Sequence, residues 1–193
     1  MKHLFTRIGL AALLLSQMAA AQNVHTIFLV RHGERASAAA DSALSPAGEA
    51  RAACLAQMLK DADIKQIYVT EVKRTQQTAA PLASQLKLKP TIIPAKDPNT
   101  LIRDLTYAGT PGNILVVGHS NTLPFIIVRL KAGTVPPIGE NEYDRMFVVT
   151  ETGGAASPVT TLHYCESGAP AASVARPKMP PKAATKKPAK KKP

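Results

Sequence analysis

The chain has 193 residues, of which 45% are hydrophobic and 19% are charged. This length can bury the core of one ordinary domain and is too short to supply two. The formal net charge of +11 is unevenly spread: of the 24 Lys and Arg residues, 8 follow Glu166 and 2 precede Gln22, which leaves 14 against 13 acidic residues between them. The basic character therefore belongs to the C-terminal segment and says nothing about a site in the folded part.

The first residues have the composition of an export signal. Lys2 and Arg7 precede a short apolar run, and small residues follow it up to Ala21. This pattern predicts a signal peptide over residues 1–21, with cleavage after Ala21. A membrane anchor would need roughly 18 consecutive apolar residues, and the run is shorter than that. We therefore expect the mature protein in the periplasm or outside the cell.

The C-terminal segment, residues 167–193, consists largely of Lys, Pro and Ala and contains no acidic residue. Such a segment buries too little apolar surface to offset the entropy lost on ordering, so we expect it to be disordered. It is either a solvated extension or an electrostatic tether to an anionic envelope polymer or membrane surface. Its lack of aromatic residues argues against specific nucleic-acid binding. The folded domain is expected over residues 22–166.

Strands and helices alternate along this domain. The run at 26–30 is short, apolar and partly β-branched, which is typical of a strand covered on both faces. Strands are predicted over 26–30, 64–70, 91–94, 114–117, 146–150 and 159–164, and helices over 46–59, 74–86, 99–107 and 122–130. This order predicts a three-layer α/β/α sandwich with a mostly parallel sheet.

The first predicted helix has a clear start and an apolar stripe. Ser45 is a good N-cap residue and Pro46 suits the first helical position. Helical spacing places a set of apolar residues on one face, which we expect to face the core. These residues are Ala47, Ala50, Cys54, Leu55, Met58 and Leu59.

The chain has two cysteines, Cys54 and Cys165. An oxidising compartment would permit a disulfide between them, although the sequence does not decide the point. Cys54 lies in a helical pattern and Cys165 ends a strand-like run. We therefore expect two small apolar core residues.

Polar residues follow three of the predicted strands. Arg31 and His32 come after the first strand, residues 71–74 after the second, and His119 after the fourth. Parallel α/β sheets place their sites just beyond the carboxyl ends of the strands. We therefore expect these side chains to converge on one pocket. The sequence contains no metal-ligand cluster, P-loop or dinucleotide fingerprint.

These residue types suit the transfer of a phosphoryl group. A covalent step needs a nucleophile that is unprotonated near neutral pH, and imidazole, with a pKa of roughly 6.5, meets this need. The phosphate also needs fixed positive donors, and guanidinium groups provide them. His32 is the candidate nucleophile, and Arg31 and Arg74 are the candidate donors. His119, when protonated, can donate a further hydrogen bond.

Three motifs carry a resemblance to a known family. They are LVRHGER from Leu29, RTQQTA from Arg74 and VVGHSNT from Val116, together with an LSPAGEARA segment in the first predicted helix. In this order, each at a predicted strand end, they resemble the histidine phosphatase superfamily, branch 1, whose fold is phosphoglycerate mutase-like. The compact length is similar to that of the small phosphohistidine phosphatases.

The resemblance implies that His32 is phosphorylated and then hydrolysed, and that Arg31, Arg74 and His119 bind the phosphoryl group. It implies no metal or other cofactor. A further set of residues next to the motifs is expected to contact substrate or to shape its site. This set is Gly33, Glu34, Arg35, Ser120 and Asn121.

Two positions depart from the family pattern. Members that act on phosphomonoesters have an acid after the RTQQTA-like helix, whereas no glutamate lies between Glu71 and Glu140 here. Asp97 and Asp104 remain, and we rank Asp97 first because of its loop position. Arg35 gives an RHGxR spacing that resembles the acid phosphatase and phytase branch. It either binds substrate or lies solvated at the rim.

A weak acid favours substrates whose leaving group needs little protonation, such as phosphohistidine or aryl phosphates. We expect an exported, metal-independent phosphatase acting on a small phosphomonoester or phosphohistidine, and we do not expect mutase activity. The alternative is a non-catalytic envelope- or polyanion-binding protein that acts through its basic tail.

Overall fold

The computed structural model describes residues 24–106 and 112–165. The predicted signal peptide and basic tail lie outside the described residues, as does Tyr107 at the end of a predicted helix.

Strands and helices alternate over the first five strands, as predicted. The strands are β1 Val24–Arg31, β2 Ile64–Val69, β3 Thr91–Ile92, β4 Asn113–Gly118, β5 Arg145–Thr152, β6 Ala155–Ala156 and β7 Thr160–His163. The helices are α2 Pro46–Leu59, α3 Lys73–Leu86, α4 Pro98–Leu105 and α5 Thr122–Arg129. Most bounds agree with the sequence prediction within two residues. The short strand β6 was not predicted.

The strands form one sheet in the order β3-β2-β4-β1-β5-β6, and β7 pairs with β5. The pairs β1 with β4, β4 with β2 and β2 with β3 are parallel. Strand β5 runs antiparallel to β1, to β6 and to β7. The four strands that alternate with the helices are therefore parallel, and the predicted fold class is confirmed.

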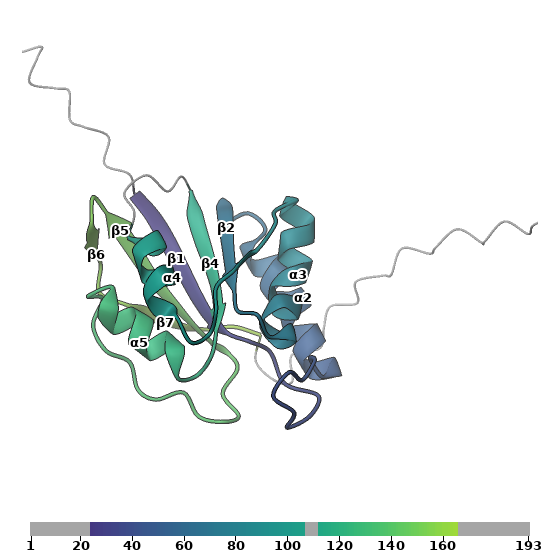
Figure 1. The fold of residues 1–193 in the computed structure, drawn as a ribbon. Coiled ribbons are helices and arrows are strands. Elements are labelled where there is room, and N and C mark those ends of the chain that lie inside the picture. Colours follow the sequence, from purple (N-terminus) through teal and green to yellow (C-terminus); the bar gives the residue numbers. More distant parts are fainter. Residues whose placement is uncertain (1–23, 107–111, 166–193) are drawn as a thin grey trace, which may run out of the picture.

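Helices cover both faces of the sheet (Figure 1), with α2 and α3 on one face and α4 and α5 on the other. Successive side chains of a strand point to opposite faces. Leu29 accordingly packs with the α4 and α5 side, whereas Val30 packs with the α2 and α3 side. Val116 and Val117 of β4 divide in the same way. The central strands are thus buried on both faces, as their continuous apolar sequence predicts.

The buried face of α2 differs from the prediction. Ser45 caps the helix, since its side chain accepts a hydrogen bond from the Gly48 N–H, as expected. The predicted stripe is wrong at Ala47, Ala50 and Met58, which are exposed, and right at Leu55 and Leu59, which are buried. The side chains and backbone that face the core belong to Gly48, Arg51, Ala52, Leu55, Ala56 and Leu59. A charged residue, Arg51, lies on this face, and the apolar pattern alone could not reveal it.

The prediction for the two cysteines is also wrong. Cys54 and Cys165 form a disulfide, with Cα atoms 6.3 Å apart and 111 positions apart in sequence. Strand β7 ends at His163, so Cys165 lies beyond the strand rather than in it. Both side chains are half-buried at the surface of α2 rather than inside the core.

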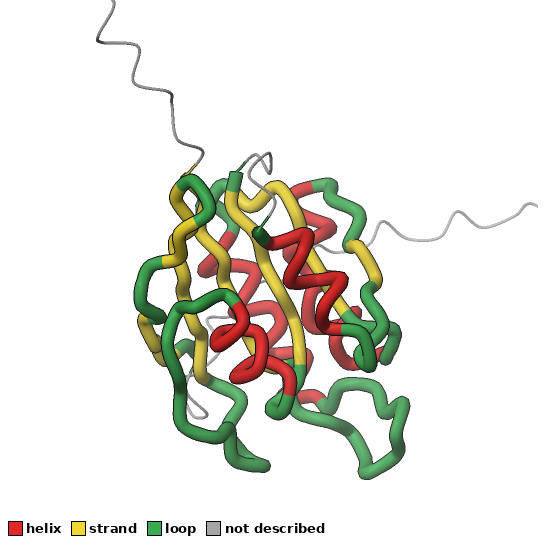
Figure 2. Tube along the Cα trace, turned by 60° about the vertical axis from the view of Figure 1, so that its left-hand side comes forward, coloured by secondary structure: helices red, strands yellow, loops and turns green. Residues whose placement is uncertain are grey.

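The carboxyl ends of the parallel strands meet two long loops. Residues 32–45 follow β1, and residues 130–144 join α5 to β5. Both loops lie at the same end of the sheet (Figures 1 and 2). The predicted site residues therefore have loops on two sides.

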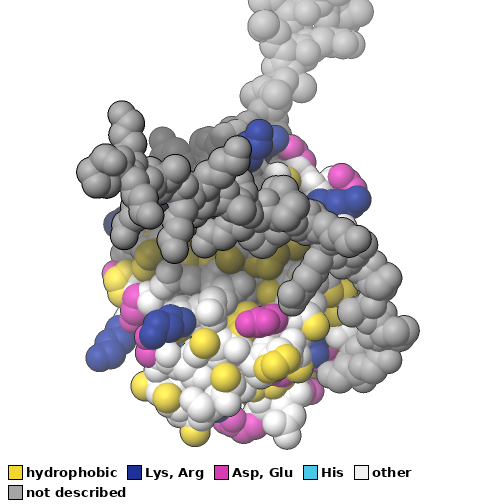
Figure 3. All heavy atoms as spheres, turned by 90° about the vertical axis from the view of Figure 1, so that its right-hand side faces the viewer, with side chains coloured by type: hydrophobic (Ala, Val, Ile, Leu, Met, Phe, Trp, Pro, Cys, Tyr) yellow, Lys and Arg dark blue, Asp and Glu magenta, His cyan; other side chains and the backbone are white. Residues whose placement is uncertain are grey.

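Among the side chains that Figure 3 shows in colour, basic and acidic ones are scattered among hydrophobic ones, without a large area of one charge sign. This agrees with the nearly balanced charge of the middle of the sequence. Among the residues that the structure describes, no helix is long and apolar enough to cross a membrane.

Candidate active site

The structure brings together the four residues that the sequence analysis ranked first. Arg31 ends β1 and is paired in register with Gly118, the residue before His119. Strand β2 lies on the other side of β4, and Arg74 stands in the first turn of the helix that follows β2. The rings of His32 and His119 have centroids 5.4 Å apart. Three adjacent strand ends thus supply one polar cluster.

His32 is held in one tautomer. Its Nδ1 lies 2.7 Å from the carbonyl oxygen of Gly33. Because a carbonyl can only accept, Nδ1 must carry the proton, and Nε2 keeps its lone pair. The ring is only 4% exposed. A buried imidazole with a free Nε2 lone pair is an activated nucleophile.

The surroundings of His32 keep it neutral. Burial, which is the largest cause, and the nearby charges of Arg74, His119 and Arg31 together lower the pKa of His32 to about 3, against a raising effect of the Gly33 hydrogen bond. Desolvation and like charge both disfavour the protonated ring. The ring therefore keeps a free Nε2 lone pair over the whole physiological pH range.

Arg31 is fixed by the loop over residues 130–144. Its Nη1 donates to the carbonyl oxygens of Gly139, Glu140 and Glu142 at 2.7, 3.0 and 3.0 Å. The guanidinium carbon lies 4.2 Å from the centroid of the Tyr143 ring, a cation–π contact. Among the described residues, the buried Nε has no partner. One side of the guanidinium is therefore held by protein acceptors.

Arg74 is arranged in a similar way. Its Nη1 donates to the carbonyl oxygen of Ala40 in the loop after β1, at 2.6 Å, and its buried Nε has no partner among the described residues. Burial lowers the pKa of Arg74, and the next largest cause is the charge of Arg35. Arg35 also forms a long ion pair with Glu140, at 3.9 Å. It thus lies near the cluster, at its half-buried rim.

His119 is the second buried imidazole. Burial, which is the largest cause, and the charge of Arg74 together lower the pKa of His119 to about 4. Its Nε2 lies 3.1 Å from the hydroxyl of Thr70. The site thus holds two neutral histidines and several guanidinium groups. A bound phosphate dianion would favour protonation of His119, which would give the ring a second N–H donor and a positive charge.

Three threonines position these groups, and the sequence analysis did not single them out as site residues. The Thr75 hydroxyl contacts both the backbone N–H and the hydroxyl of Thr70, which in turn reaches His119. The Thr78 hydroxyl accepts from the Gly33 N–H and donates to the Arg74 carbonyl. Thr75 and Thr78 belong to the RTQQTA motif and are completely buried. Their hydroxyls form the hydrogen bonds that hold Thr70 and Gly33, which explains why the motif has hydroxyls there.

Gly33 and Glu34 serve packing in this structure. A Cβ on Gly33 would lie 2.9 Å from the carbonyl oxygen of Gly48, so the catalytic loop and the start of α2 touch through their backbones. Glu34 directs its carboxylate to Arg51 of α2, with the nearest atoms 2.7 Å apart. Its partner is thus Arg51 rather than Arg35.

Asp97, the candidate acid, and Glu71, which the sequence analysis did not consider for this role, are both ionised. Asp97 caps α4 and accepts hydrogen bonds from the N–H and hydroxyl of Thr100, and these bonds lower the pKa of Asp97. Glu71 accepts from the Ala95 N–H, and hydrogen bonds to backbone lower its pKa as well. Neither carboxyl group carries a proton near neutral pH, so neither is prepared to act as a general acid.

In the loop before α5, the N-cap residue does not cap the helix with its side chain. Asn121 is the N-cap residue and makes no side-chain cap bond. Instead, the Thr122 hydroxyl accepts from the His119 N–H at 3.1 Å. Ser120, which lies between His119 and Asn121 in the sequence, is half-buried. This places Ser120 and Asn121 next to His119, without a described bond to the cluster.

An apolar pocket adjoins the cluster on the side of α4 and α5. Its lining includes Thr70 and Gly118, which neighbour His119, and apolar side chains such as Ile93, Leu101 and Ile126. Among the described residues, no group of three or more His, Cys, Asp or Glu side chains is arranged to hold a metal ion.

Part of the chain matches the model of a known protein family. Residues 27–95 match the model of the histidine phosphatase superfamily, branch 1. The matched residues contain the RHG motif, the first helix segment and the RTQQTA motif. No curated protein sequence gives a significant match.

Solved structures share the fold at low sequence identity. The structure of a putative alpha-ribazole-5'-P phosphatase from Escherichia coli str. K-12 superposes with a TM-score of 0.60 and 19% identity, over 72% of this chain and 96% of that chain. Phosphoglycerate mutase from Bacillus anthracis str. Sterne gives 0.57 and 18%, over 73% and 93%. The protein histidine phosphatase SixA, complexed with tungstate, gives 0.54 and 20%, over 72% and 96%.

The family match covers the first two motifs, and the structure sets His119 of the third beside them. Over residues 27–95 the chain is thus similar to the histidine phosphatase superfamily, branch 1, and this similarity supports an enzyme of the phosphatase type.

Proposed function

We propose that the chain is an exported, metal-independent phosphatase that forms a phosphohistidine at His32. One observation carries this proposal: a buried, neutral His32 has its Nδ1 proton bound to Gly33 and its Nε2 lone pair free, next to guanidinium Nε donors that lack a protein partner. Phosphoryl transfer through a covalent intermediate requires a nucleophile and cationic donors in one water-poor site.

The reaction follows from these roles. Nε2 of His32 attacks phosphorus, a new N–P bond forms, and the bond to the leaving group breaks, with the electron pair going to that group. Arg31 and Arg74 offset the charge on the phosphoryl oxygens, and His119 donates a hydrogen bond once the dianion has raised its pKa. Water then attacks phosphorus and loses its proton to solvent. The N–P bond breaks and orthophosphate is released.

The leaving group narrows the substrate class. Hydrogen bonds lower the pKa of Asp97 and the pKa of Glu71, so neither carboxyl group is predisposed to protonate the displaced group. An alkoxide leaves poorly without a proton, whereas an imidazole or a phenolate leaves well. We therefore place phosphohistidine and aryl phosphates ahead of sugar phosphates.

Export is part of the same proposal and rests on the N-terminal sequence. The pairing of Cys54 with Cys165 agrees with an oxidising compartment. The alternative, a non-catalytic polyanion-binding protein, depends on the basic tail, which lies outside the described residues.

The first test is hydrolysis of para-nitrophenyl phosphate by the mature protein in the presence of a chelator. We expect robust activity in the wild type and a loss of at least about a thousandfold in His32→Ala, because covalent catalysis has no substitute nucleophile here. Undiminished turnover in folded His32→Ala would refute the mechanism.

A second assay compares substrates at equal concentration. We expect the ratio of kcat to KM to be at least about tenfold higher for a phosphohistidine peptide or para-nitrophenyl phosphate than for glucose 6-phosphate. A preference for the sugar phosphate would show that an acid does operate. In that case Asp97→Asn and Glu71→Gln would identify it, through loss of activity on the sugar phosphate alone.

A further inference from the structure

Arg51 is a buried cation on the core-facing side of α2. Its side chain is 5% exposed, and that of Glu34, its partner, is 20% exposed. Nε lies 3.0 Å from Oε1 and 3.1 Å from Oε2 of Glu34, and Nη2 lies 2.7 Å from Oε1. Two adjacent donors on one carboxylate fix both side chains in position and orientation.

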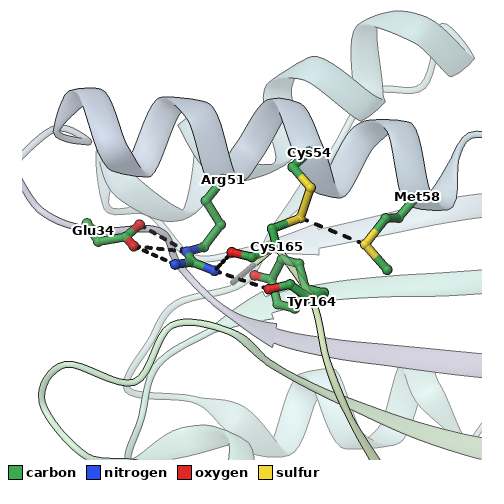
Figure 4. Close-up of a disulfide and its surroundings, with 6 residues drawn as sticks. All are labelled: Glu34, Arg51, Cys54, Met58, Tyr164 and Cys165. Carbon is green, nitrogen blue, oxygen red and sulfur yellow. Dashed lines mark hydrogen bonds and ion pairs between the residues drawn. A yellow bond between two sulfur atoms is a disulfide. The ribbon is translucent and has the colours of Figure 1, made fainter. Parts of the chain in front are cut away.

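The other end of the guanidinium holds the C-terminal end of the fold. Nη1 of Arg51 donates to the carbonyl oxygens of Cys165, at 2.8 Å, and Tyr164, at 3.3 Å. Cys165 is also tied to Cys54 of the same helix by the disulfide (Figure 4). One turn of α2 therefore binds the chain beyond β7 twice, once by a covalent bond and once through Arg51.

Glu34 connects this contact to the nucleophile. It directly follows Gly33, whose carbonyl oxygen accepts the Nδ1 proton of His32. The backbone of Glu34 also touches α2, since its carbonyl oxygen accepts from the Ser45 N–H at 2.8 Å. A fixed Glu34 side chain therefore restrains the peptide plane that sets the tautomer and direction of the His32 ring.

We infer that Arg51 is a positioning residue for catalysis: together with the Cys54–Cys165 disulfide it anchors Glu34, and thereby holds the Gly33 carbonyl against His32. This inference rests on the proposed phosphatase function. No atom of Arg51 needs to touch substrate. The inference adds a role for the disulfide, whose loss would free the carbonyls that Arg51 binds.

Stability alone is a poor explanation for this ion pair. Burying a charged pair costs desolvation energy that its attraction roughly offsets, so well-packed apolar residues would stabilise the fold at least as well. A bidentate pair does supply direction, which an apolar contact does not. The position of the pair, one residue from the carbonyl that holds His32, is where direction matters for catalysis.

The test measures kinetics in mature Arg51→Met, which keeps the length of the side chain but loses all donors. We expect kcat for para-nitrophenyl phosphate to fall about tenfold to a hundredfold, because small misplacements of a nucleophile have effects of this size. KM and the inhibition constant of inorganic phosphate should stay within about threefold, since Arg31 and Arg74 are untouched. Arg51→Lys, which can pair with Glu34 through one ammonium group, should recover part of kcat.

The matched control is Arg103→Met, which changes an exposed arginine in the last turn of α4. It should behave as wild type. Melting temperatures are recorded so that every assay runs well below unfolding. A folded Arg51→Met protein with kcat within twofold of wild type would overturn the inference. If Arg51→Met does not fold, Glu34→Gln takes its place, with the same expected fall and the same limit.

A second readout does not depend on activity. The nitrogen NMR shifts of the His32 ring report which nitrogen carries the proton. We expect the wild type to be protonated at Nδ1 alone and Arg51→Met to show a mixture of tautomers. Unchanged shifts would contradict the positioning role even in a preparation without enzymatic activity. An inactive wild type with the expected tautomer change would count against the proposed function only.

The last experiment tests the role of the disulfide. Cys54→Ala with Cys165→Ala should lower kcat in the same direction as Arg51→Met, by a smaller factor. Because the changes act through one chain of contacts, the triple variant should lose less than the product of the two separate effects. Simple multiplication of the two effects would overturn the part assigned to the disulfide.

Discussion

At the scale of residues, the site consists of ordinary groups with altered proton affinities. His32 and His119 are neutral because burial removes the water that would stabilise their charged forms, and Arg74 adds repulsion. Their neutral state has different uses. It leaves His32 a free lone pair, whereas protonation of His119 would make both of its ring nitrogens donors and add a positive charge beside the phosphate.

This difference gives a prediction for NMR titration of the histidine rings. In the free protein we expect both rings to be neutral at pH 6, with the His119 pKa near 4. Saturating inorganic phosphate should raise the His119 pKa, because the anion offsets the charge of Arg74 and Arg31. His119→Gln assigns the signal. A free-protein His119 that titrates near 6.5, or one that phosphate does not shift, would contradict this electrostatic picture.

The sequence identified the charged residues of the site better than the neutral ones. Arg31, His32, Arg74 and His119 stand out because few other roles explain such residues at strand ends. Thr70 and Thr75 do not, because a hydroxyl is equally common in loops and caps. Arg51 was missed for another reason: the apolar pattern of α2 predicts that a charged residue faces solvent. The groups that make its burial possible, among them Glu34 and the carbonyl oxygen of Cys165, are distant in sequence.

At the scale of elements, the catalytic loop depends on close backbone contact with α2. Gly33 and Gly48 face each other, and a Cβ on Gly48 would collide with the Glu34 carbonyl oxygen. The loop is therefore pressed against the start of the helix that carries Arg51. This explains the glycine in the LSPAGEARA segment, which helix propensity alone would disfavour.

Gly48→Ala tests this contact by the sign of its effect. An alanine inside a helix normally adds about 1 kcal/mol of stability relative to glycine. Here we expect the free energy of unfolding in urea to fall by about 1–3 kcal/mol, since the added methyl forces the loop away. Activity should fall with it. Ala50→Ser, at an exposed position of the same helix, should change stability by less than about 0.5 kcal/mol. A stabilised Gly48→Ala protein would show that the loop yields freely.

The sequence predicted the elements well where they alternate and poorly at the end of the chain. Apolar runs such as those of β1 and β4 admit few other structures, because both faces are buried. The two-residue strand β6 has no pattern that distinguishes it from a turn. Cys165 was assigned to the strand run, although β7 ends at His163, and the disulfide was missed for that reason.

At the scale of the whole molecule, the buried histidines link stability to pH. Their pKa values are lower in the folded state, about 3 for His32 and about 4 for His119, than the value of roughly 6.5 in the unfolded state. Below pH 6.5 the unfolded chain therefore binds protons that the folded protein does not. Above pH 6.5 both histidines are neutral in the folded and the unfolded state, so they do not make the free energy of unfolding depend on pH. Below pH 6.5 the free energy of unfolding decreases as the pH falls toward 4.

We expect the free energy of unfolding to fall between pH 7 and 5 with a slope that approaches about 1.4 kcal/mol per pH unit for each histidine. Urea unfolding at several pH values measures this slope. The double variant His32→Asn, His119→Asn should have a much flatter profile in that range, since carboxylates titrate mostly below it. Equal slopes in the two proteins would mean that other groups control the acid response.

The central claim is that the phosphoryl group passes through His32, and the most direct measurement is to trap it there. The mature protein is mixed with substrate, denatured at alkaline pH within milliseconds to seconds, digested and analysed by mass spectrometry. We expect an acid-labile phosphate on the peptide that contains His32 and none in His32→Asn. Burst-phase turnover in wild type without phosphate on this peptide, or with phosphate on another residue, would contradict the account.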